Sequence, residues 1–541
     1  MVLAIKSPKP FLFNMTDRSI TLNQLFSELP FTFSPKKLPD LTVSGITLDS
    51  RSVKPGQLFV AMQGGSVDGH DFIPEAIGNG ASAIVGKKPI KGLSIPYIRI
   101  EDPRKALTWL SAAFYDWPGR KLTVIGVTGT DGKTTTTNLI HQILISAGIK
   151  AGMISTVNAV LGEEVVDTGF HVTTPDAHDV QRYLAKMVDA GLTHVVLETT
   201  SHGWAQYRVD ACEFDIGVVT NITHEHLDQH GSYENYRAAK ARLFSSLERT
   251  LPKKNGNPRL GIINRDDISF EFLNDFIKVN KISYGFREDS DIRAIEAKFD
   301  PLGIQFKVKN NRLRVDISSK LIGRYNVSNC LAALGVTVVG LGIEPEVAAK
   351  GISEFPSVPG RMERVELGQD FLAIVDFAHT PNALKVTLEA ARGMTKGRII
   401  SVFGSAGLRD KQKRQMMAEI SAELSDLTIF TAEDPRTESL EAILAEMTAG
   451  AMSKGGREGE TFWRVPDRGA AIRFAIHLAH PGDIVLSCGK GHEQSMCFGK
   501  IEYEWDDRKA MQAALSEFLG KEGPRMPYLP TQDKSEAEWL K

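Results

Sequence analysis

The segment 124–137 reads Val-Ile-Gly-Val-Thr-Gly-Thr-Asp-Gly-Lys-Thr-Thr-Thr-Thr, an apolar run followed by a glycine-rich turn and a row of hydroxyls. Lys133 supplies a cation for the β- and γ-phosphates of a nucleotide, and the Thr134 hydroxyl suits Mg²⁺. Val127 takes the place of the first glycine of the strict pattern. The segment still predicts a strand, a P-loop and a helix that bind ATP. We expect three glycines to turn backbone N–H groups toward phosphate: Gly126, Gly129 and Gly132.

A second polar segment, 220–230, contains three histidines and lies downstream of an apolar run that ends at Glu198. Zinc is one interpretation, but no cysteine pair or His-Glu-x-x-His pattern completes a tetrahedral ligand set. Oxygen and imidazole ligands beside a P-loop instead favour Mg²⁺ held by Glu198 and His226, with ATP phosphates completing its shell.

Four apolar segments in the last third of the chain are each followed by charged residues. They are 371–375, 399–403, 427–431 and 484–486, followed by the polar segments 376–379, 404–410, 433–436 and 489–493. Ligands bind at the carboxyl ends of parallel strands, so these paired charges favour a site for a small zwitterion. A dinucleotide site is the alternative, but no Gly-x-Gly-x-x-Gly follows any of these strands.

These segments must be positioned by more than one domain, because 541 residues are too many for a single core. We predict an α/β chain of three domains, with an antiparallel section at about 281–317 in the second. The expected parts are a small N-terminal α/β domain, 1–118, a central P-loop ATPase domain, 119–357, a C-terminal Rossmann-like domain, 358–520, and a loose tail, 521–541.

Composition excludes several classes of partner. The 64 Lys and Arg residues nearly balance the 66 Asp and Glu residues, so no nucleic-acid or membrane surface is expected. No apolar stretch reaches the roughly 18 residues that span a bilayer, and the N-terminus lacks a signal-peptide core. The four cysteines are scattered, so we expect reduced thiols. A cytoplasmic protein is predicted.

In these and further motifs the chain resembles the Mur ligases of peptidoglycan synthesis, over nearly its whole length. The resemblance rests on segments 49–51, 68–70, 129–135, 173–176, 201–208, 223–230, 239–240, 264–267, 323–329 and 359–363, together with the four polar segments above. It is strongest to the members that add a diamino acid to UDP-N-acetylmuramoyl-L-alanyl-D-glutamate. It implies the three-domain Mur ligase architecture, with ATP and Mg²⁺ as cofactors. We also expect a monomer.

The resemblance also implies a role for individual residues. Those expected in catalysis are Lys133, Glu198, His226 and Lys240. Those expected to bind ATP are Gly129, Thr130, Asp131, Gly132, Lys133, Thr134, Thr135, Asn264, Asn326, Arg361, Asp376 and His379. The UDP-linked substrate is expected at Leu48, Ser50, Gly65, Ser66, Val67, Thr173, Thr174, Thr200, Gln206 and Arg208. The incoming amino acid is expected at Arg409, Asp434, Pro435, Arg436, Gly489 and Glu493. Magnesium is expected at Thr134, Glu198, His226 and a carbamylated Lys240.

The implied reaction has two steps. The D-glutamate γ-carboxylate attacks the γ-phosphate of ATP, and the amine of a diamino acid then attacks the acyl phosphate. The acceptor itself stays open among L-lysine, L-ornithine and meso-diaminopimelate. Asp434 stands where the family's diaminopimelate enzymes have asparagine, and its charge should repel a distal carboxylate, whereas Arg436 should attract one. We favour an acceptor without the second carboxylate.

Three alternatives remain at this point, one of which is a related amide ligase that acts on another cell-wall intermediate. A folylpolyglutamate synthetase shares the ATPase and C-terminal domains, but the Asp49-Ser50-Arg51 segment of the first domain argues against it. A non-catalytic ATP-binding relative is disfavoured because the expected catalytic residues are present.

Overall fold

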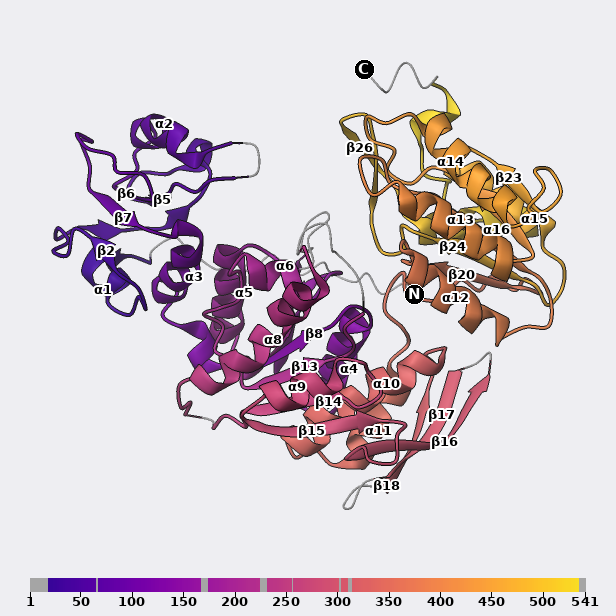
Figure 1. Cartoon of the computed structure of the whole chain (residues 1–541), viewed down its shortest axis with the longest axis horizontal. Helices are drawn as coiled ribbons and strands as arrows, with labels where there is room; N and C mark the ends of the chain where they lie inside the picture. The colour runs from indigo at the N-terminus through magenta and orange to yellow at the C-terminus, as the bar shows by residue number, and fades with distance from the viewer. Residues whose placement is uncertain are drawn as a thin grey trace, which may run out of the picture.

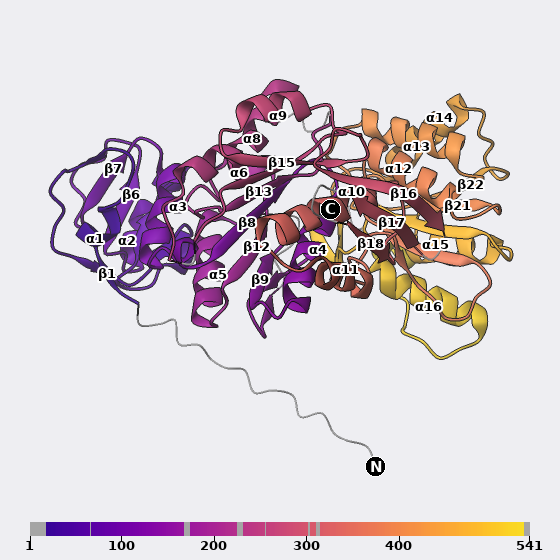
Figure 2. The same cartoon turned by 90° about the horizontal axis from the view of Figure 1, so that it is seen from below.

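Three α/β domains follow one another in the computed structural model, as the sequence predicts (Figure 1). The structure describes residues 18–64, 67–166, 174–223, 231–254, 256–300, 303–309 and 314–534. Each domain is built on its own principal sheet, and the central domain lies between the other two (Figure 2). Among the described residues, no helix is both long and apolar enough to cross a membrane.

The N-terminal domain has a five-stranded sheet in which four strands are parallel and β2 pairs antiparallel with β7. In spatial order the strands are β2 (Phe33–Ser34), β7 (Tyr97–Ile100), β6 (Ala83–Gly86), β5 (Leu58–Val60) and β4 (Ile46–Thr47). A short pair, β1 (Ile20–Thr21) and β3 (Thr42–Val43), and three helices, α1 (Leu22–Phe26), α2 (Ile73–Gly78) and α3 (Pro103–Phe114), complete it. Ala177 and Ala185 of the central domain belong to its hydrophobic core, so the two domains are packed together.

The central domain is an eleven-stranded sheet whose middle strands are parallel. In spatial order these are β11 (Val165–Val166), β10 (Ala159–Val160), β9 (Ala151–Ile154), β12 (His194–Glu198), β8 (Thr123–Thr128), β13 (Ile216–Val219), β14 (Leu260–Asn264), β15 (Asn280–Gly285), β16 (Ile292–Asp300), β17 (Gly303–Lys309) and β18 (Arg314–Ser319). Strand β8 is buried along its whole length, which explains its unbroken apolar character.

Helices cover both faces of this sheet. Alternate residues of β8 and β12 point to opposite faces, so Val124 and Val195 lie in one core while Ile125 and Val196 lie in the other. One face carries α4 (Lys133–Ser146), α10 (Arg324–Leu334) and α11 (Pro345–Glu354). The other carries α5 (Ala177–Asp189), α6 (Ser201–Ala205), α8 (Tyr233–Arg249) and α9 (Phe270–Phe276).

The antiparallel section of this domain begins later than expected. Strand β15 at 280–285 pairs parallel with both β14 and β16, and in this section the antiparallel pairs are β16 with β17 and β17 with β18. The expectation of antiparallel pairing from Lys281 onward is therefore wrong. The apolar pattern of a strand does not identify its partner, because pairing is set by where the chain returns to the sheet.

The principal sheet of the C-terminal domain has six strands, of which only β19 pairs antiparallel with its neighbour. In spatial order they are β19 (Glu363–Arg364), β20 (Leu372–Asp376), β24 (Ile484–Cys488), β21 (Ile399–Phe403), β22 (Leu427–Phe430) and β23 (Phe462–Arg464). The helices are α12 (Pro381–Arg392), α13 (Gln412–Leu424), α14 (Leu440–Ser453), α15 (Arg468–Leu478) and α16 (Asp507–Leu519), and β25 (Ser495–Phe498) pairs with β26 (Ile501–Glu504).

Two details of this domain differ from expectation. A fifth parallel strand, β23, extends the four expected ones; it is too short to give a clear apolar signal. One part of the expected tail is anchored to the domain: Leu529 is fully buried, and the Thr531 hydroxyl donates to Asp467 at 2.7 Å. Residues 521–525 and 532–534 are exposed, and we retain 118/119, 357/358 and 520/521 as proposed boundaries and the loose tail as a prediction.

Candidate functional site

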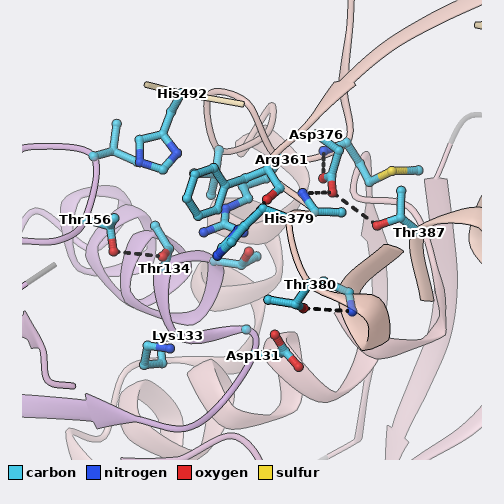
Figure 3. A pocket seen from close by; sticks show the side chains of 18 of the residues that line it. Asp131, Lys133, Thr134, Thr156, Arg361, Asp376, His379, Thr380, Thr387 and His492 are labelled. Atoms are coloured by element: carbon cyan, nitrogen blue, oxygen red, sulfur yellow. Dashed lines mark hydrogen bonds between the residues drawn. The ribbon is translucent and has the colours of Figure 1, made fainter. Parts of the chain in front are cut away.

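A cleft of about 2130 Å³ lies between the central and C-terminal domains. Its walls include the P-loop and the ends of β12 and β13 on one side, and the ends of β20, β22 and β24 on the other. Figure 3 shows this meeting, with Lys133 and Thr134 on one side and Arg361 and His379 on the other. The strand-end segments of the two sheets thus face one shared space, as expected for open parallel sheets.

The P-loop follows β8 and leads into α4. Gly132 caps that helix with φ of 81°, in the left-handed region that glycine adopts without strain. The Lys133 Nζ donates to the Thr130 carbonyl at 2.7 Å, within the loop. The N-terminus of α4 lies at the wall of the cleft, and the first backbone N–H groups of a helix have no partner within the helix, which is the arrangement that binds phosphate.

The role expected for Gly126 is wrong. It lies inside β8, not in the loop, and a Cβ there would stand 2.5 Å from Leu243 and 2.8 Å from Phe214. Glycine is needed at this position because α8 packs closely on the sheet. Gly129 does stand in the loop, where a Cβ would lie 1.8 Å from the Thr220 hydroxyl.

Glu198 ends β12 and is almost fully buried beside the P-loop. The Thr134 hydroxyl donates to its Oε1 at 3.1 Å, and the Thr156 N–H and hydroxyl donate to its two oxygens at 3.0 and 2.9 Å. This cluster of hard oxygens at the phosphate end of the cleft fits Mg²⁺. Thr156 was not expected; it lies between β9 and β10, where no sequence pattern marks it.

The remaining ligand expected for magnesium on this side, His226, lies outside the described residues. Lys240 is placed on α8 and is buried, with its Nζ donating to the Gly129 carbonyl and lying 4.6 Å from the Tyr236 ring centroid. The lysine is thus directed at the P-loop. Its carbamylation stays a prediction of the resemblance.

The C-terminal domain contributes an ordered group around Asp376. This buried carboxylate accepts from the Met362 and Ala378 N–H groups at 2.7 and 2.9 Å and from the Thr387 hydroxyl at 3.1 Å (Figure 3). Burial raises its pKa. The Asp376 carboxylate therefore fixes the backbone at Met362 and Ala378, which are the sequence neighbours of two residues that line the cleft.

Those neighbours are Arg361 and His379, which flank the ring of Phe377. The Arg361 guanidinium carbon lies 4.4 Å from the Phe377 ring centroid, and the His379 ring also lies 4.4 Å from it. Burial lowers the pKa of His379 to about 3, so the imidazole is neutral near pH 7. Arg361 is therefore the charged member of this group that can face a phosphate.

The other residues expected to bind ATP lie around the same cleft. Asn264 and Asn326 line it, and their amides are held by the carbonyls of Thr220 and Ile322 at 2.7 Å each. Asp131 of the P-loop accepts a hydrogen bond of 3.4 Å from Asn382 of the C-terminal domain. The remaining members also line the cleft: Gly129, Thr130, Gly132 and Thr135.

The residues expected to bind the UDP-linked substrate fall into two groups. Thr174, Thr200, Gln206 and Arg208 line the cleft, and the Arg208 guanidinium donates to Gln206 Oε1 at 2.7 and 3.0 Å. Leu48, Ser50 and Val67 belong to the N-terminal domain and are not among the residues that line the cleft. Gly65, Ser66 and Thr173 lie outside the described residues.

The residues expected to bind the amino acid gather after β22 and β24. Asp434, Arg436, Gly489 and Glu493 line the cleft together with the exposed Arg409, whereas Pro435 is buried and does not. Next to them Glu433 is buried, and burial raises its pKa to about 8. Glu433 is therefore protonated near neutral pH and adds little charge.

Asp434 does not present a bare charge to the cleft, contrary to expectation. Its two oxygens lie 3.1 and 3.0 Å from the Nζ of Lys490, and the Cys497 N–H donates to it at 2.8 Å. The same Nζ lies 2.5 Å from Glu493. Arg436 lines the cleft with no side-chain partner among the described residues. The charge of Asp434 therefore does not exclude a second carboxylate from the acceptor, because Lys490 compensates it.

Comparison with known proteins assigns each part of the chain to one family. Residues 42–115 match the Mur ligase family catalytic domain, residues 127–337 the Mur ligase middle domain, and residues 360–491 the Mur ligase glutamate ligase domain.

Similar whole proteins agree with these matches. A "UDP-N-acetylmuramyl-tripeptide synthetase" of Roseiflexus sp. (strain RS-1) is 41% identical over 89% of this chain and 97% of its own length. A "UDP-N-acetylmuramoyl-L-alanyl-D-glutamate--2,6-diaminopimelate ligase" of Geobacillus kaustophilus (strain HTA426) is 38% identical over 88% and 96%. A solved structure of a ligase with that second name superposes with a TM-score of 0.64 at 26% identity, covering 93% of this chain and 99% of its own.

Three consecutive domain matches, and relatives aligned along almost their entire length, account for the P-loop, the interdomain cleft and the charged strand ends together. The chain belongs to the Mur ligase family.

Proposed function

We propose that this protein is an ATP-dependent ligase that adds a diamino acid to UDP-N-acetylmuramoyl-L-alanyl-D-glutamate in peptidoglycan synthesis. One observation carries the proposal: a single cleft brings together the P-loop, the hydroxyl and arginine group around Arg208, and the charged group around Arg436. These three sets suit a triphosphate, an acidic sugar-peptide and an amino acid. The 38 to 41% identical relatives carry names for the same reaction type.

In the first step the D-glutamate γ-carboxylate attacks the γ-phosphate of ATP, forming an acyl phosphate and releasing ADP. Lys133 and Arg361 approach the phosphates from the two domains and stabilise the charge that spreads over the phosphoryl oxygens. Bound Mg²⁺ would be held by Glu198 and Thr134, and by His226 and a carbamylated Lys240 as the resemblance implies, and would neutralise phosphate charge.

In the second step the neutral amine of the incoming amino acid attacks the acyl carbon, the bond from that carbon to the phosphate oxygen breaks, and the amide forms as hydrogen phosphate leaves with the proton that the nitrogen loses. No side-chain nucleophile is required. The acceptor group lies on the C-terminal domain and the P-loop on the central domain, so closing the cleft would bring amine and acyl phosphate together and exclude water.

The charges at the end of the cleft near Arg436 favour an amino acid whose distal end carries both an ammonium group and a carboxylate. Asp434 and Glu493 share one cation, Lys490, so this group retains one negative charge that suits an ammonium. Arg436 remains for a carboxylate. L-Lysine or L-ornithine would leave Arg436 without a partner, whereas meso-diaminopimelate satisfies both, and we propose it as the acceptor.

Phosphate release from ATP tests both the proposed ligase activity and the proposed acceptor. The purified protein is incubated with UDP-N-acetylmuramoyl-L-alanyl-D-glutamate and L-lysine, L-ornithine or meso-diaminopimelate. Turnover with any of the three supports the ligase, and the highest kcat/KM for meso-diaminopimelate supports the acceptor. Turnover only when glutamate is added to a folate substrate would support the folylpolyglutamate synthetase alternative. Binding of ATP without turnover of any substrate would support a non-catalytic relative.

Location and assembly stay predictions. A cytoplasmic monomer is expected, and size-exclusion chromatography with light scattering would contradict the second part if it gave the mass of a dimer.

A further inference from the structure

Lys490 lies behind the acceptor end of the cleft and does not line it. It follows β24 after one residue, Gly489, and its side chain has no exposed surface. The Nζ lies 3.0 Å from Asp434 and 2.5 Å from Glu493, two carboxylates that both line the cleft. A buried cation therefore supports two acids from the side that faces away from the substrate.

We propose that Lys490 is a specificity-determining positioning residue, which cancels the charge of Asp434 and so lets the pocket accept a distal carboxylate beside Arg436. This inference rests on the proposed ligase function. Lys490 would not touch the amino acid. It would act by setting the net charge of the surface that the amino acid meets.

Three hydrogen bonds hold the Asp434 carboxylate beside this cation and the neighbouring backbone. One oxygen accepts from the Lys490 Nζ at 3.1 Å and from the Cys497 N–H at 2.8 Å, and the other accepts from the Nζ at 3.0 Å. The backbone of Asp434 has φ of 42°, so the loop holds the residue in the left-handed region to make these contacts. Because the pair is buried, solvent screens it little, and the loss of one partner would be felt strongly at the pocket.

Charge counting gives an ordered prediction for four proteins. Lys490, Asp434 and Glu493 together carry one negative charge in the natural chain. Lys490→Met leaves two negative charges, Asp434→Asn leaves none, and the double variant again leaves one. If net charge governs the choice, the preference for meso-diaminopimelate over L-lysine should follow this order.

The experiment measures kcat/KM for meso-diaminopimelate and for L-lysine with all four proteins. We expect the ratio of the two values to fall by about tenfold or more in Lys490→Met, to rise in Asp434→Asn, and to return close to the natural ratio in the double variant. KM for ATP and for the UDP-linked substrate should change little. Lys454→Met, which removes an exposed lysine paired with Glu423, is the matched control and should leave every value unchanged.

A purely structural role would lower kcat/KM for both acceptors by the same factor, and that result would overturn the proposal. A double variant that keeps the altered ratio of Lys490→Met would also overturn it. If Lys490→Met fails to fold, Asp434→Asn and the double variant still decide, because the first should raise the ratio and the second should not. Absence of turnover by the natural protein with every diamino acid would instead overturn the proposed function on which this inference rests.

Discussion

Replacing Glu433 by glutamine should make the stability of the C-terminal domain less sensitive to pH. Glu433 is 7% exposed, and its Oε2 atom has no hydrogen-bond partner among the described residues. Burial outweighs the nearby cations of Arg468, Lys490 and Lys413 and raises the pKa from 4.5 to about 8. The carboxyl group is therefore neutral in the folded protein under conditions where the unfolded chain is ionised.

The sign follows from proton binding. Between pH 4.5 and about 8 the folded state holds one proton more than the unfolded state, so the free energy of unfolding falls as pH rises through this window and levels off above it. The full pKa shift corresponds to a decrease in the free energy of unfolding of at most on the order of 5 kcal/mol, because one pKa unit is worth about 1.4 kcal/mol. Glutamine has nearly the same shape as the protonated acid and does not titrate in this range.

The assay is denaturant unfolding of the natural protein and Glu433→Gln at intervals from pH 5 to pH 9. We expect the variant to gain stability relative to the natural protein as pH rises, by up to several kcal/mol at the alkaline end. Glu522→Gln, at an exposed glutamate, is the control and should give a constant difference. A difference between Glu433→Gln and the natural protein that does not change with pH would show that Glu433 is ionised in the folded state.

Three further outcomes are expected. Lys133→Met should lower kcat by about 10²- to 10³-fold with unchanged thermal unfolding, and phosphate release near the natural rate would contradict its role. Gly360→Ala should lower Tm and activity together, because Gly360 has a φ of 66° and a Cβ on it would lie 2.1 Å from the backbone nitrogen of His492. An unchanged Tm would mean that the linker between the domains can shift. Asp507→Asn should lower the free energy of unfolding by about 3 to 5 kcal/mol, because Arg468 would stay buried without its charge partner. A loss below about 1 kcal/mol in denaturant unfolding would contradict this expectation.

Much of the central domain could be predicted from local sequence. The P-loop is a contiguous strand, turn and helix, so its residues need no distant partner to be identified. Glu198 could be placed at the end of a strand for the same reason. Gly126 shows the limit of such inference: the sequence cannot distinguish a glycine that faces phosphate from one that allows Leu243 to pack on the sheet.

The C-terminal domain illustrates how strand order changes the interpretation of a site. Its strands lie in the order β20, β24, β21, β22, so segments distant in the chain become neighbours. The loops after β22 and β24 converge, which brings Lys490 to Asp434 across 56 residues of sequence. No periodicity or motif spacing indicates that pairing, and the expected acceptor changed when it became visible.

The sequence by itself determined the fold class, the three-domain order, the P-loop and a group of the residues that line the cleft, because these depend on local patterns of apolar residues, glycines and charges. The tertiary structure alone decided which charges are compensated. Thr156 joins Glu198, Asn382 of the third domain reaches Asp131 of the second, and Lys490 neutralises Asp434. The electrostatic effect of a side chain depends on the charges and solvent within a few ångströms of it, and those distances are set by chain crossing and packing.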